Sequence, residues 1–175
     1  SIDILHTAST KEFVKELGNA AFATVAQKSD KLKRSFLATL KSLTASFGYD
    51  PINATPTFNI RLGDIDSPDY TLDEIFAFLE SADKPCVIAI DEFQRIANYS
   101  EKNVEELLRG KIQNLTNTHI IFAGSERRIL SEMFHSDKKP FYQSATTLML
   151  EAIARDEYYA FAQKQFSKSG KKFQR

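Results

Sequence analysis

The stretch Cys86-Val87-Ile88-Ala89-Ile90-Asp91-Glu92 decides the fold class of this chain. Its first five residues are apolar without a break, which is typical of a strand covered on both faces in a parallel sheet. Two carboxylates follow directly. In parallel α/β sheets, functional groups collect where strands reach their C-terminal edge. The stretch therefore predicts an interior strand that presents Asp91 and Glu92 at that edge.

A second apolar run at residues 119–123 ends in the same way, with Gly124 and Ser125. Between the two runs, apolar residues recur at helical spacing, which predicts one amphipathic helix. Its apolar positions are Val104, Leu107, Leu108, Ile112 and Leu115. An order of strand, helix and strand favours an α/β domain with a mostly parallel sheet.

The rest of the chain alternates between helical and strand patterns. Capping-box signatures at Ser9 and Glu12 and at Thr71 and Glu74 each predict the start of a helix. The first of these helices is expected to run to about residue 27. A further helix is expected from Ser29 until glycine interrupts the pattern at residue 48. Alternation predicts strands at 1–5, 57–62 and 146–150, and helical spacing predicts helices over residues 129–134 and 155–167.

Composition narrows the classes of function. The chain has 175 residues, enough for one compact domain, and its 23 basic residues balance its 23 acidic ones. No overall charge therefore favours nucleic acid or an anionic membrane. Cys86 is the single cysteine, which excludes an internal disulfide and fits a cytoplasmic setting. No apolar stretch approaches the roughly 20 residues that span a bilayer, so no membrane partner is expected.

Asp91, Glu92 and Ser125 each have a structural and a chemical interpretation. Carboxylates suit helix N-termini, so the acidic pair can serve only the turn at Phe93 and Gln94. Ser125 can likewise cap the helix that follows it. The chemical alternative is a site in which carboxylate oxygens bind Mg²⁺ and polarise water. The residues alone leave both interpretations open.

Taken together, the two strand ends resemble the archaeal-type ATPases, a branch of the AAA+-related and STAND P-loop NTPases. The matching segments are residues 88–94 (Ile-Ala-Ile-Asp-Glu-Phe-Gln) for Walker B, residues 119–125 for the sensor strand, and residues 140–144 before the strand at 146–150. The resemblance implies a three-layer P-loop NTPase-like domain that binds ATP and Mg²⁺. It implies Asp91 as the Mg²⁺ ligand, Glu92 as the residue that activates water, and Ser125 as the sensor of the γ-phosphate.

The chain departs from this family in two places. Members often carry an arginine in the loop that matches residues 140–144, and here Gln143 takes that place. Arg127 and Arg128 are the alternatives for approaching phosphate or a neighbouring subunit, although a solvated helix face suits them too. The phosphate-binding loop G-x-x-x-x-G-K-[ST] is missing, since no glycine of this sequence supplies it.

The family pattern places the missing loop and its strand within about 30 to 40 residues upstream of Ser1, judged from the size of one βαβ unit. Residues 1–167 are therefore expected to form a partial P-loop ATPase domain without its first strand, followed by a basic, frayed end at 168–175. This chain alone is expected to be inactive. The absent strand leaves a sheet edge that a second copy can cover, which predicts a homo-oligomer.

The intact protein is thus expected to be an ATP-driven conformational switch, with a protein or DNA partner bound through regions outside this chain. The alternative is a non-catalytic interaction module on a degenerate NTPase scaffold. A nucleic-acid-binding domain is a third interpretation. It rests on the basic helix face of Lys31, Lys33, Arg34 and Lys41 and on the end at 168–175.

Overall fold

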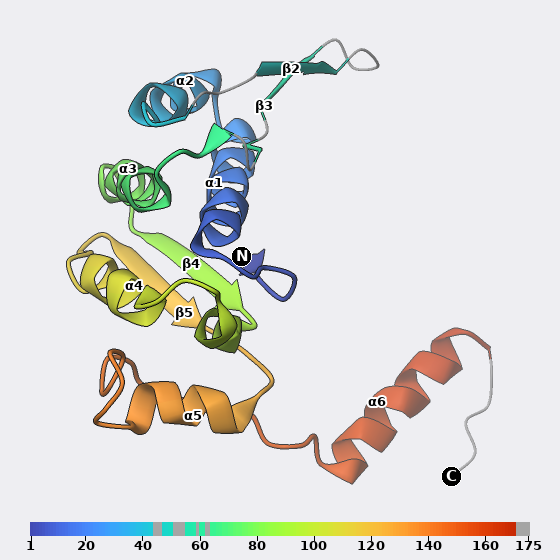
Figure 1. Cartoon of the computed structure of the whole chain (residues 1–175). Coiled ribbons are helices and arrows are strands. Elements are labelled where there is room, and N and C mark those ends of the chain that lie inside the picture. Colours follow the sequence, from blue (N-terminus) through green and yellow to red (C-terminus); the bar gives the residue numbers. More distant parts are fainter. Residues whose placement is uncertain (44–46, 51–54, 59, 62–63, 171–175) are drawn as a thin grey trace. The chain divides into compact units, whose positions relative to one another are not determined.

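The computed structural model describes residues 1–43, 47–50, 55–58, 60–61 and 64–170 (Figure 1). Its backbone contacts divide the chain into two compact units, Ser1–Ser144 and Ala145–Arg175. The first unit contains β1 (Ile2–Asp3), α1 (Thr10–Ala26), α2 (Asp30–Thr39), β2 (Phe47–Asp50), β3 (Thr55–Phe58), α3 (Pro68–Glu80), β4 (Cys86–Asp91), the 3-10 helix η2 (Phe93–Asn98), α4 (Val104–Ile112), β5 (Thr118–Phe122) and α5 (Arg127–His135). The second contains α6 (Arg155–Lys168).

A small parallel sheet organises the first unit. Its described strands lie in the order β1-β4-β5, and both pairings are parallel. Ile2 is opposite Ile90, and the β4–β5 register runs from Cys86 opposite Thr118 to Ile90 opposite Phe122. The α/β class and the parallel sheet expected from the sequence are therefore confirmed.

The two faces of this sheet differ in how far they are covered. Ile88 and Ile90 are buried in the core, whereas Val87 on the opposite face is 61% exposed. On β5, Ile121 is 53% exposed on that same open face. The prediction that residues 86–90 are covered on both faces is thus wrong within the first unit, because none of its described elements packs over Val87 and Ile121. An apolar face is left open.

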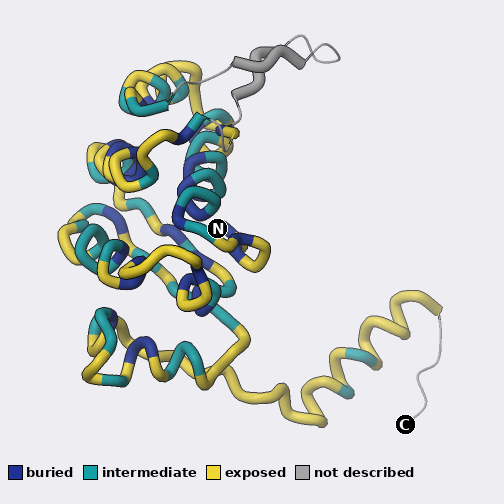
Figure 2. Tube along the Cα trace, viewed as in Figure 1, coloured by how far each residue is buried: buried dark blue, intermediate teal, exposed yellow. Residues whose placement is uncertain are grey.

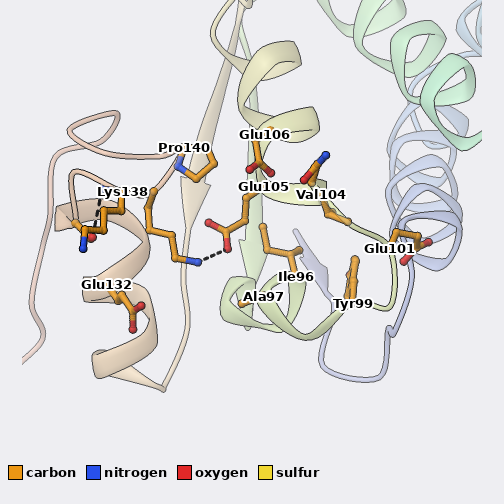
Figure 3. A pocket seen from close by; sticks show the side chains of 13 residues that line it. Ile96, Ala97, Tyr99, Glu101, Val104, Glu105, Glu106, Glu132, Lys138 and Pro140 are labelled. Atoms are coloured by element: carbon orange, nitrogen blue, oxygen red, sulfur yellow. Dashed lines mark hydrogen bonds and ion pairs between the residues drawn. The ribbon is translucent and has the colours of Figure 1, made fainter.

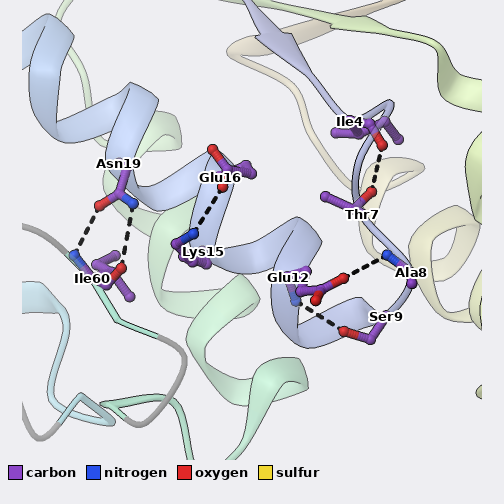
Figure 4. A network of polar contacts seen from close by, with 9 residues as sticks. All are labelled: Ile4, Thr7, Ala8, Ser9, Glu12, Lys15, Glu16, Asn19 and Ile60. Atoms are coloured by element: carbon purple, nitrogen blue, oxygen red, sulfur yellow. Dashed lines mark hydrogen bonds and ion pairs between the residues drawn. The ribbon is translucent and has the colours of Figure 1, made fainter.

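Helix α1 forms as its sequence predicts. Ser9 is the N-cap and its Oγ accepts a hydrogen bond from the backbone N–H of Glu12 at 3.2 Å, while the Glu12 carboxylate accepts from the N–H of Ala8 at 2.5 Å (Figure 4). These bonds satisfy N–H groups that have no partner inside the helix. The helix buries an apolar stripe, which contains Phe13, Val14, Leu17 and Val25.

Helix α2 starts at the predicted cap, Ser29, but ends at Thr39 instead of reaching residue 48. Past its end, the backbone N–H groups of Lys41 and Ser42 donate to the Glu74 carboxylate, and that of Lys41 also donates to the Thr39 carbonyl, so the helical hydrogen-bond pattern does not continue. Beyond it, β2 and β3 pair in antiparallel register, and the sequence predicted no strand at the position of β2. The predicted strand 57–62 overlaps β3, and its positions 59 and 62 lie outside the described residues.

The capping box predicted at Thr71 and Glu74 is wrong. Helix α3 begins one turn earlier, with Ser67 as N-cap and Pro68 in the first turn, where proline's fixed φ angle suits a helix start. Thr71 and Glu74 are instead buried on the inner face. The Thr71 hydroxyl donates to the carbonyl of Ser67. The Glu74 carboxylate accepts a hydrogen bond from the backbone N–H of Ser42, just past the end of α2. A side chain that looked like a cap therefore ties two helices together.

The second unit holds α6, which agrees with the helix predicted at 155–167. The strand predicted at 146–150 is wrong, because the backbone of this segment does not form a strand and Leu148 is 84% exposed. None of residues 145–170 is buried (Figure 2). The domain predicted over residues 1–167 spans the division at Ser144 and stays a prediction. Most of the predicted frayed end, residues 171–175, lies outside the described part of the chain.

No helix in the described ranges combines the length and the apolar character that crossing a membrane requires.

Glu80, the last residue of α3, joins that helix to the start of β5. Its carboxylate accepts the backbone N–H groups of Thr116 at 2.8 Å and of Asn117 at 3.0 Å. These backbone hydrogen bonds, that of Thr116 first, lower the pKa of Glu80 from 4.5 to about 2. The Asn117 side chain returns a hydrogen bond to the carbonyl of Glu80. The contact thereby fixes where β5 enters the sheet.

We predict that Glu80→Gln lowers the melting temperature at neutral pH, because an amide accepts these N–H groups more weakly than a carboxylate. Since the folded pKa lies below the unfolded value of 4.5, the stabilisation by Glu80 is complete above that value and is lost as the pH falls toward about 2. The difference between the wild type and the variant should therefore shrink from pH 7 to pH 2.

Thermal unfolding followed by circular dichroism over this pH range measures the effect. Asp83→Asn, a change of an exposed carboxylate in the adjacent turn, is the matched control and should show a much smaller difference. A pH-independent difference for Glu80→Gln would contradict the assignment.

Candidate functional site

The ends of β4 and β5 are held together beyond the last paired strand residues. The N–H of Ala123 donates to the carbonyl of Ile90 at 2.8 Å, and the N–H of Phe93 donates to the carbonyl of Ala123 at 2.9 Å. Between these bonds, Glu92 adopts a left-handed backbone with φ of 56°. The strand end turns sharply there, so the two loops that carry the predicted site residues run side by side.

This arrangement brings two of the three predicted site residues into contact. The Ser125 hydroxyl donates to Glu92 Oε2 at 3.1 Å. Ser125 does not cap the following helix, because the N-cap of α5 is Glu126 and only the backbone carbonyl of Ser125 accepts the Arg127 N–H. The capping interpretation of Ser125 is therefore wrong. Glu92 precedes η2, yet its side chain makes no capping hydrogen bond either.

Gln94 is the third member of the cluster, and its role was not predicted from the sequence. Its Nε2 donates to Glu92 Oε2 at 2.5 Å, the same oxygen that Ser125 binds. Gln94 is 1% exposed, and its Oε1 is buried without a hydrogen-bond partner. One sequence signal could have pointed to Gln94. It is a polar residue next to Phe93 and close to Ile96, two apolar positions at which η2 faces the core.

Gly124 leaves the space that the Gln94 side chain occupies. A Cβ atom added to Gly124 would lie 2.0 Å from Gln94 Oε1 and 2.9 Å from Leu130 Cδ1. Real Cβ atoms do not approach other atoms so closely, so any larger residue displaces Gln94 or the α5 side chain. Glycine is needed here for close approach.

Asp91 lies at the end of β4 and is exposed, opposite Asp3 of β1 in the parallel register. Its Oδ1 accepts the backbone N–H of Glu92 at 3.0 Å. No group of three potential metal ligands exists among the described residues. Mg²⁺ commonly uses one or two protein carboxylates and fills its other positions with water and substrate phosphate. Asp91 could be one such carboxylate ligand. The described residues do not supply a complete set of protein ligands for a metal ion.

An aromatic cluster fixes the turn that carries Glu92 and Gln94. Phe93 is fully buried, with its ring centroid 4.3 Å from that of Phe122 and 5.4 Å from that of Phe141. Phe134 of α5 packs against the same rings. The cluster joins η2, β5, α5 and the segment after α5, so the polar residues at the two strand ends rest on a rigid apolar base.

The two arginines that could approach phosphate follow Ser125 closely, and the backbone N–H of Arg127 donates to the Ser125 carbonyl at 3.1 Å. Arg127 and Arg128 are exposed in the first turn of α5. Gln143, at the place where the family often has arginine, adopts a left-handed backbone with φ of 51° and donates to the Tyr142 hydroxyl.

A separate pocket of about 370 Å³ opens between η2, α4 and the segment that follows α5 (Figure 3). Four glutamates line it, and one of them, Glu105, pairs with Lys139 at 2.8 Å. This hydrogen bond to Glu105 raises the pKa of Lys139. The four glutamates outnumber the two lysines of the lining, Lys138 and Lys139, so the walls carry net negative charge and repel phosphate. The pocket contains neither Glu92 nor Ser125 and does not suit a nucleotide.

No protein-family model matches the chain, and no curated protein matches it significantly. The resemblance to archaeal-type ATPases therefore stays a prediction that rests on the residues themselves.

We predict that Gly124→Ala destabilises the first unit by about 1 to 3 kcal/mol, the usual cost of overpacking. Gly110→Ala is the matched control, because nothing lies within 4 Å of a Cβ added there and alanine favours the helix. It should be neutral or stabilising, by up to about 1 kcal/mol. Urea unfolding of both variants measures the difference, and equal stabilities would show that Gln94 does not fill the space over Gly124.

Proposed function

We propose that this chain is the Walker B and sensor part of an ATP-hydrolysing P-loop NTPase that acts as a conformational switch. The observation that carries the proposal is the hydrogen bond from Ser125 to Glu92 across the ends of two adjacent parallel strands. A hydroxyl that senses phosphate and a carboxylate that acts on water must lie within a few ångströms of one reacting group. An ordinary strand end followed by helix caps would not require this contact.

Each residue has a defined part in the proposed reaction. Glu92 orients a water molecule and accepts its proton as the water oxygen bonds to the γ-phosphorus. The bond from that phosphorus to the bridging oxygen breaks, ADP leaves with the electron pair, and the proton passes on to phosphate. Ser125 keeps its proton and donates a hydrogen bond through its hydroxyl to a γ-phosphate oxygen. Asp91 would hold Mg²⁺, which neutralises charge on the phosphates when it is bound.

The phosphate-binding loop has to come from outside residues 1–175, because the sequence contains no such motif. Two features of the first unit support a further strand beside the sheet and a helix that packs on its open face. β5 lies at an edge of the described sheet, and the adjoining face leaves Val87 and Ile121 exposed. A strand beside β5, followed by a helix over that face, would complete a three-layer domain. Tight ATP binding is therefore assigned to the longer protein, in the cytoplasm.

A non-catalytic interaction module remains the second candidate. The open apolar face around Val87 and Ile121 favours it, as do the exposed apolar side chains of the second unit. In this case a second copy or another protein would cover the edge at β5, and no nucleotide would be needed. The third interpretation, nucleic-acid binding, has weaker support. Lys33 on the basic face of α2 forms an ion pair with Asp30 at 3.0 Å, which partly neutralises that face.

We predict that Glu92→Gln, in a protein that includes the upstream segment, lowers kcat for ATP hydrolysis by about 10²-fold or more, because general bases contribute at least that factor. Asp91→Asn should raise the Mg²⁺ concentration needed for half-maximal activity. Steady-state phosphate release measures both effects.

Glu106→Gln is the matched control, since this exposed glutamate lies at the acidic pocket rather than at the strand ends. It should leave turnover unchanged. If Glu92→Gln hydrolyses ATP at the unmodified rate, Glu92 does not activate water and the proposal is wrong. If the longer protein neither binds nor hydrolyses ATP, the interaction module is favoured.

A further inference from the structure

Two donors of different character meet at one oxygen of the candidate site. Glu92 Oε2 accepts from Gln94 Nε2 at 2.5 Å and from Ser125 Oγ at 3.1 Å. Gln94 is buried, whereas Ser125 is exposed. A buried amide held in the core cannot reach solvent or a ligand without repacking, but an exposed hydroxyl can rotate. The two hydrogen bonds therefore differ in how easily they exchange.

The orientation of the Gln94 amide follows from its neighbours. Its nitrogen faces the Glu92 carboxylate, and its oxygen lies in the space over Gly124. The reversed orientation would place the amide oxygen against the carboxylate, where neither group can donate a proton. Gln94 is thus a fixed donor. The unsatisfied Oε1, which is buried without a partner, is the energetic cost of this orientation.

The Ser125 hydroxyl, by contrast, has a single proton to donate. It can bind Glu92 or a phosphate oxygen, but it cannot donate to both in one linear hydrogen bond. If Ser125 senses phosphate, it must release Glu92 Oε2 when nucleotide arrives. A carboxylate that then lacked any donor would be free to turn about its side-chain bonds.

We propose that Gln94 is a positioning residue that keeps Glu92 oriented while Ser125 transfers its hydrogen bond from Glu92 to the nucleotide phosphate. This inference rests on the proposed function, because it requires a phosphate for Ser125 to bind. The departure of Ser125 opens one lone-pair site on Glu92 Oε2, and the attacking water takes it. Binding of the nucleotide phosphate thereby frees Glu92 Oε2 to bind the attacking water. Turnover would then be regulated by the nucleotide at the site itself.

The first experiment examines the chain without nucleotide. Nuclear magnetic resonance measures exchange with solvent of the Gln94 side-chain amide protons. Slow exchange is expected in the wild type, and Glu92→Ala should accelerate it by about tenfold or more, because it removes the acceptor. The exposed side chain of Gln113 is the internal control and should exchange rapidly in both proteins. Equal exchange of the Gln94 protons in the two proteins would overturn the inference.

The second experiment uses the longer, nucleotide-binding protein. Gln94→Met keeps the length of the side chain and removes its donor, and Gln113→Met is the matched surface control. Gln94→Met should lower kcat by about tenfold or more with KM for ATP changed less than twofold, since it disturbs only the orientation of Glu92. Ser125→Ala should instead raise KM as well. A purely structural role for Gln94 would lower the melting temperature without this kcat effect.

The two levels of the proposal fail differently. Normal turnover in Gln94→Met, together with lost turnover in Glu92→Gln, would overturn the positioning role of Gln94 and leave the proposed function intact. Normal turnover in Glu92→Gln would overturn the proposed function, and the role of Gln94 with it.

Discussion

The first unit depends on the continuation of the β4–β5 pairing past the ends of both strands. Backbone hydrogen bonds from Ala123 to Ile90 and from Phe93 to Ala123 hold the two loops in register, over an apolar base formed by Phe93 and Phe122. Because these bonds fix the loops, the side chains of Glu92 and Ser125 reach each other across them. The Glu92–Ser125 contact therefore follows from sheet geometry.

Much of this architecture could be predicted from the sequence, because strong patterns agreed with one another. The apolar runs before Asp91 and Gly124 identified two adjacent parallel strands, and Ser9 with Glu12 located the start of α1. Glu92 and Ser125 were found because they follow those runs directly. The failures occurred where tertiary contacts overrode local signals. Glu74 has the spacing of a capping residue, yet its carboxylate accepts the backbone N–H of Lys41, beyond the end of α2.

Gln94 shows a different reason for failure. Its role depends on the absence of a side chain at Gly124 and on a left-handed turn at Glu92, and neither can be read from spacing along the chain. The open face at Val87 and Ile121 was missed for a related reason. An uninterrupted apolar run shows that both faces of a strand could be buried. It does not show whether the described chain covers both faces, and here Val87 and Ile121 stay exposed. Both faces of the strand read alike in the sequence, and only one is covered.

A crystal structure of the longer protein with a non-hydrolysable ATP analogue would decide whether the ends of β4 and β5 form the catalytic half of an ATP site. We expect the γ-phosphate within hydrogen-bond distance of Ser125 Oγ, Glu92 still bound by Gln94, and an added strand along the free edge of β5. An analogue bound elsewhere, with the hydrogen bond from Ser125 to Glu92 unchanged, would contradict it.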